Sequence, residues 1–479
     1  MSKIKKLLNY CLAFISAVSF TCCSRKTGES LIESAERESI QSTNLPDYDK
    51  EEADEMIFTG WYSPTVSEES FRLYKDCGFN RMFLQGLEVG GLGDPKMQEA
   101  LTLCDNLGIG AMIDVTQSED LIIPLLDSFT AHKSFMGFNY DEPVIYRNTL
   151  NNRAGIIDLS AYVKGIIQKK SDVEFLVNLN PTMAISYPWG TPPFTYDEYI
   201  DAQLLYINEA YINSTCHNWL SCDDYPLCYN TTVKNPYYLK RAWLQNLEYL
   251  ANAKRDSDFP LSTNFFIQSM PLGTDKNRVP TYEDLRLQIY TLMAFGYDSV
   301  SFFCYQTPPK TGEFDMEQYA LIDRNGNKTE IYDSSKKIIN EIQNFSHVYM
   351  QFNDNCLGIY PILGSNNLEN DDMYYNLSYD NLLDPITNMR DLIKIKSVTA
   401  TEDTIVGCMV DKNNNPGYMF VNYNDTYYKK TSTVEVCFNR SNKALVFRNG
   451  VKTVETLVDG KLNFPLGVGE GVFVIPYAE

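Results

Sequence analysis

Two adjacent acids, Asp141 and Glu142, are the residues of this sequence whose types and spacing point most directly to catalysis. They end the segment 134–143, in which an apolar run is followed by both carboxylates and then by Pro143. Such a run predicts a strand that is buried on both faces and stops at its acidic end. Two neighbouring carboxyls resist ionising together, which raises the pKa of one of them and suits it to donate a proton. Asp141 and Glu142 are therefore candidate catalytic residues, and an ordinary acidic loop between a strand and a helix is the alternative.

Other strand-like segments also end in acids, amides and aromatic rings. Carboxylates and amides hydrogen-bond sugar hydroxyls and move protons, and aromatic rings stack on pyranose faces. Asp223, at the end of the sixth strand, is the third candidate catalytic residue. The candidate substrate-binding residues are Trp61, Tyr62, Asn180, Trp189, Asp224, Tyr225, Gln268 and Tyr305. Packing in the core is the alternative role for each aromatic residue among them.

An alternation of strand-like and helix-like segments, with 236–254 as one of the predicted helices, predicts the scaffold that brings these ends together. Eight such pairs fill residues 55–352, which is the number and length of a (β/α)8 TIM barrel, an α/β fold. The carboxyl ends of the strands form the mouth of such a barrel, where active sites lie. Glycines at positions 78, 108 and 296 are expected to end helices. Residues 353–479 show short β-rich runs between turn signals, which predicts a C-terminal antiparallel β-sandwich. The predicted strands are 393–398, 404–410, 417–422, 432–438, 444–448, 452–457 and 471–476.

Composition excludes several classes of function. The 479 residues carry 41 basic and 62 acidic side chains, a net charge of −21, which argues against nucleic acid as a partner. With three histidines and no paired cysteine motif, we expect no metal site, and no phosphate- or dinucleotide-binding glycine motif indicates a cofactor. Cys216, Cys222 and Cys228 are evenly spaced, and either a disulfide or free thiols fits them. The sequence does not predict an oligomeric state.

The N-terminus has the pattern of an export signal. Lysines precede an apolar run, 7–20, that is too short to span a bilayer and ends at two cysteines. Residues 1–22 resemble a bacterial lipoprotein signal, which implies cleavage before Cys22, or alternatively Cys23, and acylation of the new N-terminus. A plain secretory signal is the alternative. Residues 23–54 are expected to form a flexible tether, so the predicted location is the outer membrane or cell surface, or else the periplasm.

Three segments resemble the clan A glycoside hydrolases, in particular the β-galactosidase-like group related to family 42. They are 138–143 (FNYDEP), 302–308 (FFCYQTP) and 320–332 (ALIDRNGNKTEIY). The resemblance implies a glycosidase with Glu142 as the acid/base on strand four, where Asp141 replaces an Asn that usually holds a sugar 2-hydroxyl. The C-terminal sandwich is similar to the accessory domains of such enzymes.

One departure from that pattern leaves the mechanism open. Clan A places its nucleophilic Glu at the end of strand seven, where this chain has Gln268, and an amide cannot act as that nucleophile. Asp223 could act as a base or a displaced nucleophile. Alternatively, Asp141 and Glu142 resemble the Asp-Glu pair of hexosaminidases in which the substrate acetamido group attacks. In the remaining alternative the protein is a lipoprotein that binds glycans without cleaving them.

Overall fold

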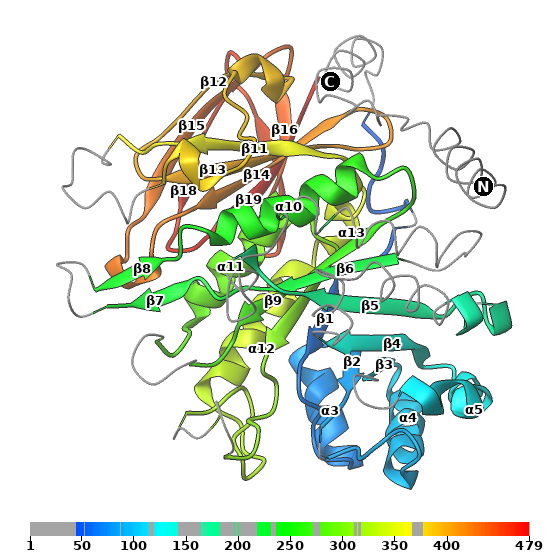
Figure 1. The fold of residues 1–479 in the computed structure, drawn as a ribbon. Helices are drawn as coiled ribbons and strands as arrows, with labels where there is room; N and C mark the ends of the chain where they lie inside the picture. The colour runs from blue at the N-terminus through cyan, green and yellow to red at the C-terminus, as the bar shows by residue number, and fades with distance from the viewer. Residues whose placement is uncertain are drawn as a thin grey trace, which may run out of the picture.

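The computed structural model describes most of the chain from residue 45 to residue 478. The described residues are 45–51, 53–86, 88–114, 119–141, 164–166, 168–182, 196, 200, 218–230, 236–271, 278–310, 314, 318–365 and 377–478. They form an eight-stranded parallel barrel followed by antiparallel sheets, as the sequence predicts (Figure 1).

The barrel strands follow the predicted alternation. They are β1 (Ile57–Gly60), β2 (Arg81–Leu84), β3 (Gly110–Asp114), β4 (Phe135–Asp141), β5 (Glu174–Leu179), β6 (Asn218–Asp223), β9 (Ser262–Gln268) and β10 (Ser299–Phe303). All their pairings are parallel, in the order β1-β10-β9-β6-β5-β4-β3-β2. A hairpin, β7 (Leu227–Tyr229) and β8 (Tyr237–Leu239), is inserted after β6. All eight carboxyl ends therefore point to one end of the barrel.

Side chains contribute strongly to closing the barrel between β1 and β2. At the base, the Asn80 side chain accepts from the Phe58 N–H at 2.8 Å, and the Asn80 N–H donates to the Phe58 carbonyl at 3.2 Å. Halfway up, the buried Tyr74 hydroxyl accepts from the Gly60 N–H at 2.8 Å and donates to the Arg81 carbonyl at 2.6 Å. Tyr74 thus joins the two strands from outside the sheet.

At the mouth, Ser63 completes the same seam. Its hydroxyl donates to the Phe83 carbonyl at 2.7 Å and accepts from the Gln85 N–H at 2.8 Å. The ends of β1 and β2 are therefore fixed relative to each other where the candidate residue Trp61 emerges.

Helices cover the outside of the barrel. They are α3 (Glu68–Cys77), α4 (Pro95–Leu107), α5 (Glu119–Thr130), α10 (Trp243–Asp256), α11 (Tyr282–Ala294), α12 (Glu330–Gln343) and the short α13 (Ser346–Tyr349). Gly78 and Gly108 cap α3 and α4 in the left-handed conformation, with φ of 107° and 63°, which confirms their predicted role. Residues 236–254, predicted as one helix, begin instead as strand β8, because this segment pairs with β7.

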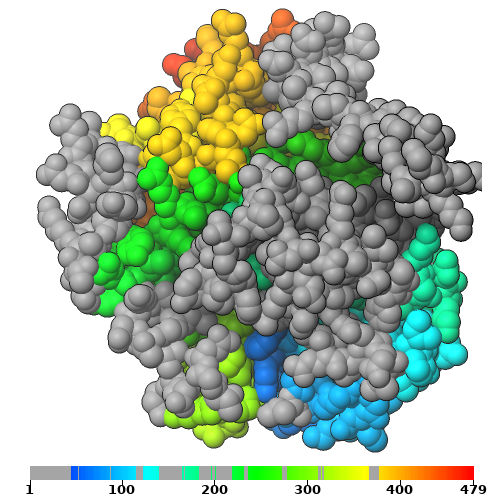
Figure 2. Space-filling view, viewed as in Figure 1, coloured from blue at the N-terminus to red at the C-terminus, as the bar shows by residue number. Residues whose placement is uncertain are grey.

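Two antiparallel sheets form the C-terminal part, which lies above the barrel in Figure 1. The larger contains β11 (Cys356–Ile362), β13 (Thr404–Val410), β14 (Pro416–Asn422), β19 (Gly471–Tyr477), β16 (Lys443–Arg448) and β17 (Val451–Thr456). The smaller contains β12 (Ile395–Ala400), β15 (Ser432–Phe438) and β18 (Lys461–Leu466). Strands β11 and β18 were not predicted. In the space-filling view the yellow and orange residues of this part gather next to green residues of the barrel (Figure 2).

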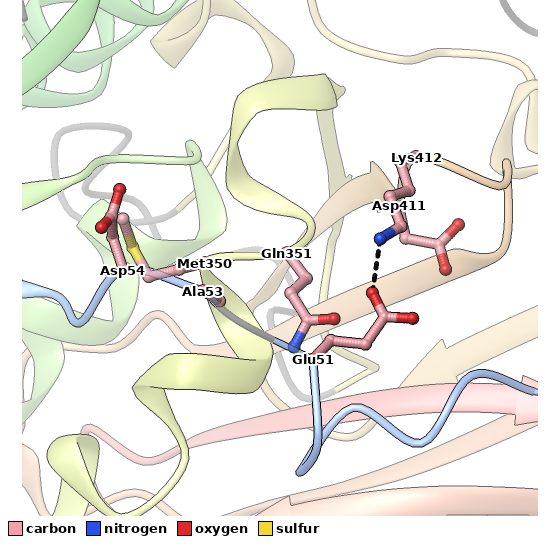
Figure 3. A pocket seen from close by; sticks show the side chains of 7 residues that line it. All are labelled: Glu51, Ala53, Asp54, Met350, Gln351, Asp411 and Lys412. Carbon is pink, nitrogen blue, oxygen red and sulfur yellow. Dashed lines mark ion pairs between the residues drawn. The ribbon is translucent and has the colours of Figure 1, made fainter.

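The described part of the predicted tether packs against the folded protein. Tyr48 is buried and its hydroxyl donates to Asp411 at 2.8 Å, while Glu51 pairs with Lys412 at 2.6 Å. These contacts border a small pocket of about 230 Å³ (Figure 3). Among the described residues, no helix is long and apolar enough to cross a membrane.

Candidate functional site

The barrel interior is apolar in its middle and polar toward both ends. At the base, Arg81 pairs with the buried Glu174 at 2.8 Å, and the Trp219 indole N–H donates to the same carboxylate at 2.8 Å. Above this group lies a cluster of buried apolar side chains: Phe83, Met112, Leu176, Trp219 and Phe266. Because strand side chains alternate between faces, Asn178 follows Glu174 and Leu176 into the interior. The polar residues nearer the carboxyl ends therefore face the predicted mouth.

Asp223 is the candidate catalytic residue whose surroundings the structure defines best. It is the last residue of β6, it is partly exposed, and its Oδ1 accepts from Asn178 Nδ2 at 3.1 Å. A donated hydrogen bond of this kind favours the ionised form of a carboxyl group. Asn178 is in turn the register partner of Asp141 across the β4–β5 pairing. Asp141 and Asp223 thus end the two strands, β4 and β6, that pair with β5, the strand that carries Asn178.

A chain of buried hydrogen bonds leads to Asp223. Ser301 donates to Asn264 Oδ1 at 2.8 Å, Asn264 Nδ2 donates to Ser221 Oγ at 2.8 Å, and Ser221 donates to Asn178 Oδ1 at 2.9 Å. Ser221, Asn264 and Ser301 were not predicted from the sequence to be functional residues. The sequence did contain a signal for these residues, which is a polar residue inside a buried strand. Ser221, for example, lies two positions before Asp223, so both side chains are on the same face of β6.

Asp224, predicted to bind substrate, is held in a structural network instead. It is 3% exposed and pairs with Lys240 of the β8–α10 connection. Its second oxygen accepts from Asn246 Nδ2 at 2.6 Å, and its first also accepts from the Tyr225 N–H at 3.0 Å. Of the two adjacent acids, Asp223 therefore lies toward the interior and Asp224 anchors α10.

Aromatic side chains lie at the same end of the barrel. The Trp61 ring packs against Phe303 at a centroid distance of 5.0 Å, and Tyr225 packs against Phe303 at 5.3 Å. The Gln85 amide is oriented so that its oxygen faces β1. This oxygen accepts from Trp61 Nε1 at 2.6 Å and from the Tyr62 N–H at 3.0 Å. Trp61 and Tyr225 are half-buried, whereas Tyr62 is 8% exposed. Trp61 and Tyr225 thus retain accessible ring surface.

Gln268 lies at the end of the seventh barrel strand and is completely buried. Its Oε1 accepts from the Leu227 N–H at 3.3 Å, while its Nε2 has no hydrogen-bond partner within the described structure. The amide of Asn139, on β4, is also completely buried, and neither of its polar atoms has a partner there. Buried polar groups without a protein partner are uncommon in native structures.

Tyr305 does not reach the mouth. It is fully buried between the barrel and α3, where its ring contacts Tyr74 at 4.6 Å and Phe79 at 5.5 Å. Burial raises the pKa of Tyr305 well above its ordinary value. Its role is therefore packing, because the chain leaves the inner face of the sheet after Phe303. Asn180 is half-buried beyond β5, and its carbonyl accepts from the Tyr196 hydroxyl at 2.9 Å.

The remaining candidate site residues lie wholly or partly outside the described part of the chain. Glu142 and Trp189 lie outside the described residues, and of Asp141 only the backbone is described. Cys216 also lies outside them, whereas Cys222 and Cys228 are free thiols, so the structure gives no disulfide between those two. Burial raises the pKa of the Cys222 thiol well above its usual range.

A cavity of about 540 Å³ opens at the opposite end of the barrel. Both basic residues of its lining are engaged in ion pairs, because Arg81 pairs with Glu174 at 2.8 Å and Lys254 pairs with Asp298 at 2.7 Å. This arrangement is typical of the end of a barrel that contributes stability. The carboxyl ends of the strands therefore remain the candidate active site.

The comparisons with known proteins agree in fold and not in sequence. No protein-family model matches the chain, and no curated protein matches it. A catalytic mutant of Gan42B, a GH42 β-galactosidase from G. stearothermophilus, is 8% identical with a TM-score of 0.52, over 89% of this chain and 99% of that chain.

Two further solved structures align less closely. The β-galactosidase from the psychrophilic Marinomonas ef1 is 10% identical with a TM-score of 0.43. The match covers 63% of this chain and 64% of the length of that β-galactosidase. A GH27 β-L-arabinopyranosidase from Geobacillus stearothermophilus is 12% identical with a TM-score of 0.41, over 90% and 97% of the two chains. The chain therefore shares the TIM-barrel fold of Gan42B, a GH42 β-galactosidase, at low sequence identity.

Proposed function

We propose that this protein is a glycoside hydrolase that cleaves an oligosaccharide or polysaccharide fragment at the carboxyl ends of the barrel strands. The observation that carries the proposal is the Asp223 carboxylate, which ends β6, accepts from Asn178 at 3.1 Å and shares that end of the barrel with Trp61 and Tyr225. Carboxylates beside partly exposed aromatic rings supply both proton transfer and sugar stacking.

The two acids take complementary roles in this mechanism. Glu142 donates its proton to the glycosidic oxygen as the bond from that oxygen to the anomeric carbon breaks. A water molecule bonds to the anomeric carbon and its proton passes to Asp223. Alternatively, Asp223 attacks the carbon directly and water later releases the sugar. The distance between the two carboxyls distinguishes these routes, because inversion needs room for the water.

Purified protein tested on aryl glycosides and glycan libraries, with released reducing ends as the readout, tests this function. We expect Glu142→Gln and Asp223→Asn each to lower turnover about a thousand-fold, the scale of general acid/base catalysis. Asp76→Asn, which alters an exposed acid on α3, is the matched control and should leave turnover unchanged. Wild-type turnover in Glu142→Gln would refute the acid assignment, and no product from any glycan would refute hydrolysis.

Gln268 favours a second candidate function, which is glycan binding without cleavage. A buried amide stands where the resembling enzymes carry their nucleophile, and its Oε1 is engaged by Leu227. Glycan-array binding without product release would favour this function. Including N-acetylhexosaminides separates the substrate-assisted alternative, because only those substrates carry the attacking acetamido group.

We also propose export and lipid anchoring through Cys22, on the signal pattern of the sequence alone. Metabolic labelling with a radioactive fatty acid tests this in a bacterial host. The wild-type chain should be labelled and Cys22→Ser should not, whereas label that persists in Cys22→Ser and disappears in Cys23→Ser would move the anchor to Cys23.

A further inference from the structure

We propose that Asn178, Ser221, Asn264 and Ser301 are positioning residues that hold Asp223 as an ionised carboxylate, so that Asp223 is the base or nucleophile and never the proton donor. This inference rests on the proposed function and assigns one of its two catalytic roles. The four residues come from strands β5, β6, β9 and β10, which are consecutive neighbours in the barrel.

The direction of the hydrogen bonds carries the argument. All four hydrogen bonds of this series run toward Asp223. The donors and acceptors are Ser301 to Asn264, Asn264 to Ser221, Ser221 to Asn178, and Asn178 to Asp223. Because Asn178 Oδ1 is occupied by the Ser221 hydroxyl, its NH₂ group must face the acid. An NH₂ group donates more strongly to an ionised carboxylate than to the carbonyl oxygen of a neutral carboxyl, and it cannot accept the proton of the neutral form. The series of hydrogen bonds is therefore complementary to the charged form of Asp223.

Burial makes this arrangement rigid. Ser221, Asn264 and Ser301 are completely buried, and Asn178 is 3% exposed. Hydrogen bonds in such surroundings are stronger than in water, and aligned chains polarise one another. Reversing the Asn178 amide would bring its oxygen against the carboxylate and leave the Ser221 hydroxyl facing an NH₂ group. The energy of two contacts therefore opposes any flip that would favour protonation of Asp223.

The test is the pH profile of kcat/KM for a hydrolysed glycan, measured for the wild type, Asn178→Ala, Ser221→Ala and Ser301→Ala. Loss of a donor to a carboxylate favours its neutral form, so the acidic limb should move to higher pH. We expect about one pH unit for Asn178→Ala, the effect of one charge-assisted hydrogen bond. Smaller shifts in the same direction should follow for Ser221→Ala and then Ser301→Ala.

Two controls separate positioning from folding. Ser269→Ala removes another completely buried serine, whose hydroxyl donates to the Cys304 carbonyl at 3.3 Å, and should leave the acidic limb in place. Ser221→Thr keeps the hydroxyl and should restore the wild-type profile. A shift of the basic limb, or an unchanged profile in Asn178→Ala, would overturn the proposal.

A second readout does not depend on turnover. The side-chain carbon of Asp223, assigned by its disappearance in Asp223→Asn, can be titrated by ¹³C NMR in the wild type and in Ser221→Ala. The titration midpoint should be higher in Ser221→Ala, and an equal midpoint would refute the positioning role. If no glycan is cleaved while the midpoint still moves, the hydrolase function fails and the positioning of Asp223 stands.

Discussion

Replacing Tyr74 by Phe should weaken the closure of the barrel without changing the size of its core. Tyr74 is completely buried, and its hydroxyl joins the Gly60 N–H of β1 to the Arg81 carbonyl of β2. Tyr74→Phe keeps the ring and leaves both backbone groups buried without that partner. Because an unsatisfied buried group costs about 1–3 kcal/mol, we expect the free energy of unfolding to fall by about 3 kcal/mol.

Urea unfolding followed by tryptophan fluorescence measures this loss, since Trp219 lies inside the barrel. Tyr332→Phe is the matched control, because within the described structure the Tyr332 hydroxyl makes one hydrogen bond, to the Leu73 carbonyl at 2.7 Å, on the outside of the sheet. We expect about 1 kcal/mol for that control. If Tyr74→Phe costs no more than Tyr332→Phe, the hydroxyl does not hold the seam and the account of barrel closure is wrong.

Three further changes test other parts of the structure. Burial alone would raise the pKa of Glu470, but the hydrogen bond from Arg448 and the nearby charge of Arg286 hold this pKa below 4.5. Glu470 therefore stabilises the folded state above pH 4.5, and this contribution is lost as the pH falls through the folded pKa. Glu470→Gln should cost about 3 kcal/mol at pH 7 and flatten urea stability between pH 5 and pH 3, whereas an unchanged acid slope would contradict this. Gly407→Ala would bring a Cβ to 2.1 Å from a backbone oxygen of α11, so we expect a loss of about 3 kcal/mol in the same assay, and near-neutral stability would contradict that contact. Gln268→Glu should not raise turnover, because the side chain is fully buried and engaged by Leu227, and a gain in hydrolysis would refute its structural role.

The sequence predicted the fold well because its signals are local. Alternating apolar segments mark the βα units, glycines end several of their helices, and strands β13 and β15 have the predicted bounds, Thr404–Val410 and Ser432–Phe438. The missed strands lack such signals. Strand β11 contains both Gly358 and Pro361, and β18 is largely exposed and also contains a proline, so only long-range pairing defines them.

The site was predicted less completely, because a strand tip does not reveal which way its last side chain points. Asp223 and Asp224 are indistinguishable in sequence, yet one lies toward the barrel interior and the other pairs with Lys240. Tyr305 also sits at a predicted tip, but the chain has already turned out of the sheet there. These distinctions depend on three-dimensional pairing, which single-sequence patterns do not contain.

The amide at Gln268 has a structural explanation that also bears on the mechanism. Its Oε1 holds the N–H of Leu227, which begins the hairpin four residues after Asp223, so the end of the seventh strand fixes the loop that leaves the sixth. A carboxylate in that buried position would carry a charge with no cation among its hydrogen-bond partners in the described structure, at a cost of several kcal/mol. The carboxylate that the structure describes at the mouth is instead Asp223 on β6, which ends a series of hydrogen bonds that favours its ionised form. The missing acid on strand seven is therefore compatible with catalysis, provided that Asp223 takes the role of base or nucleophile.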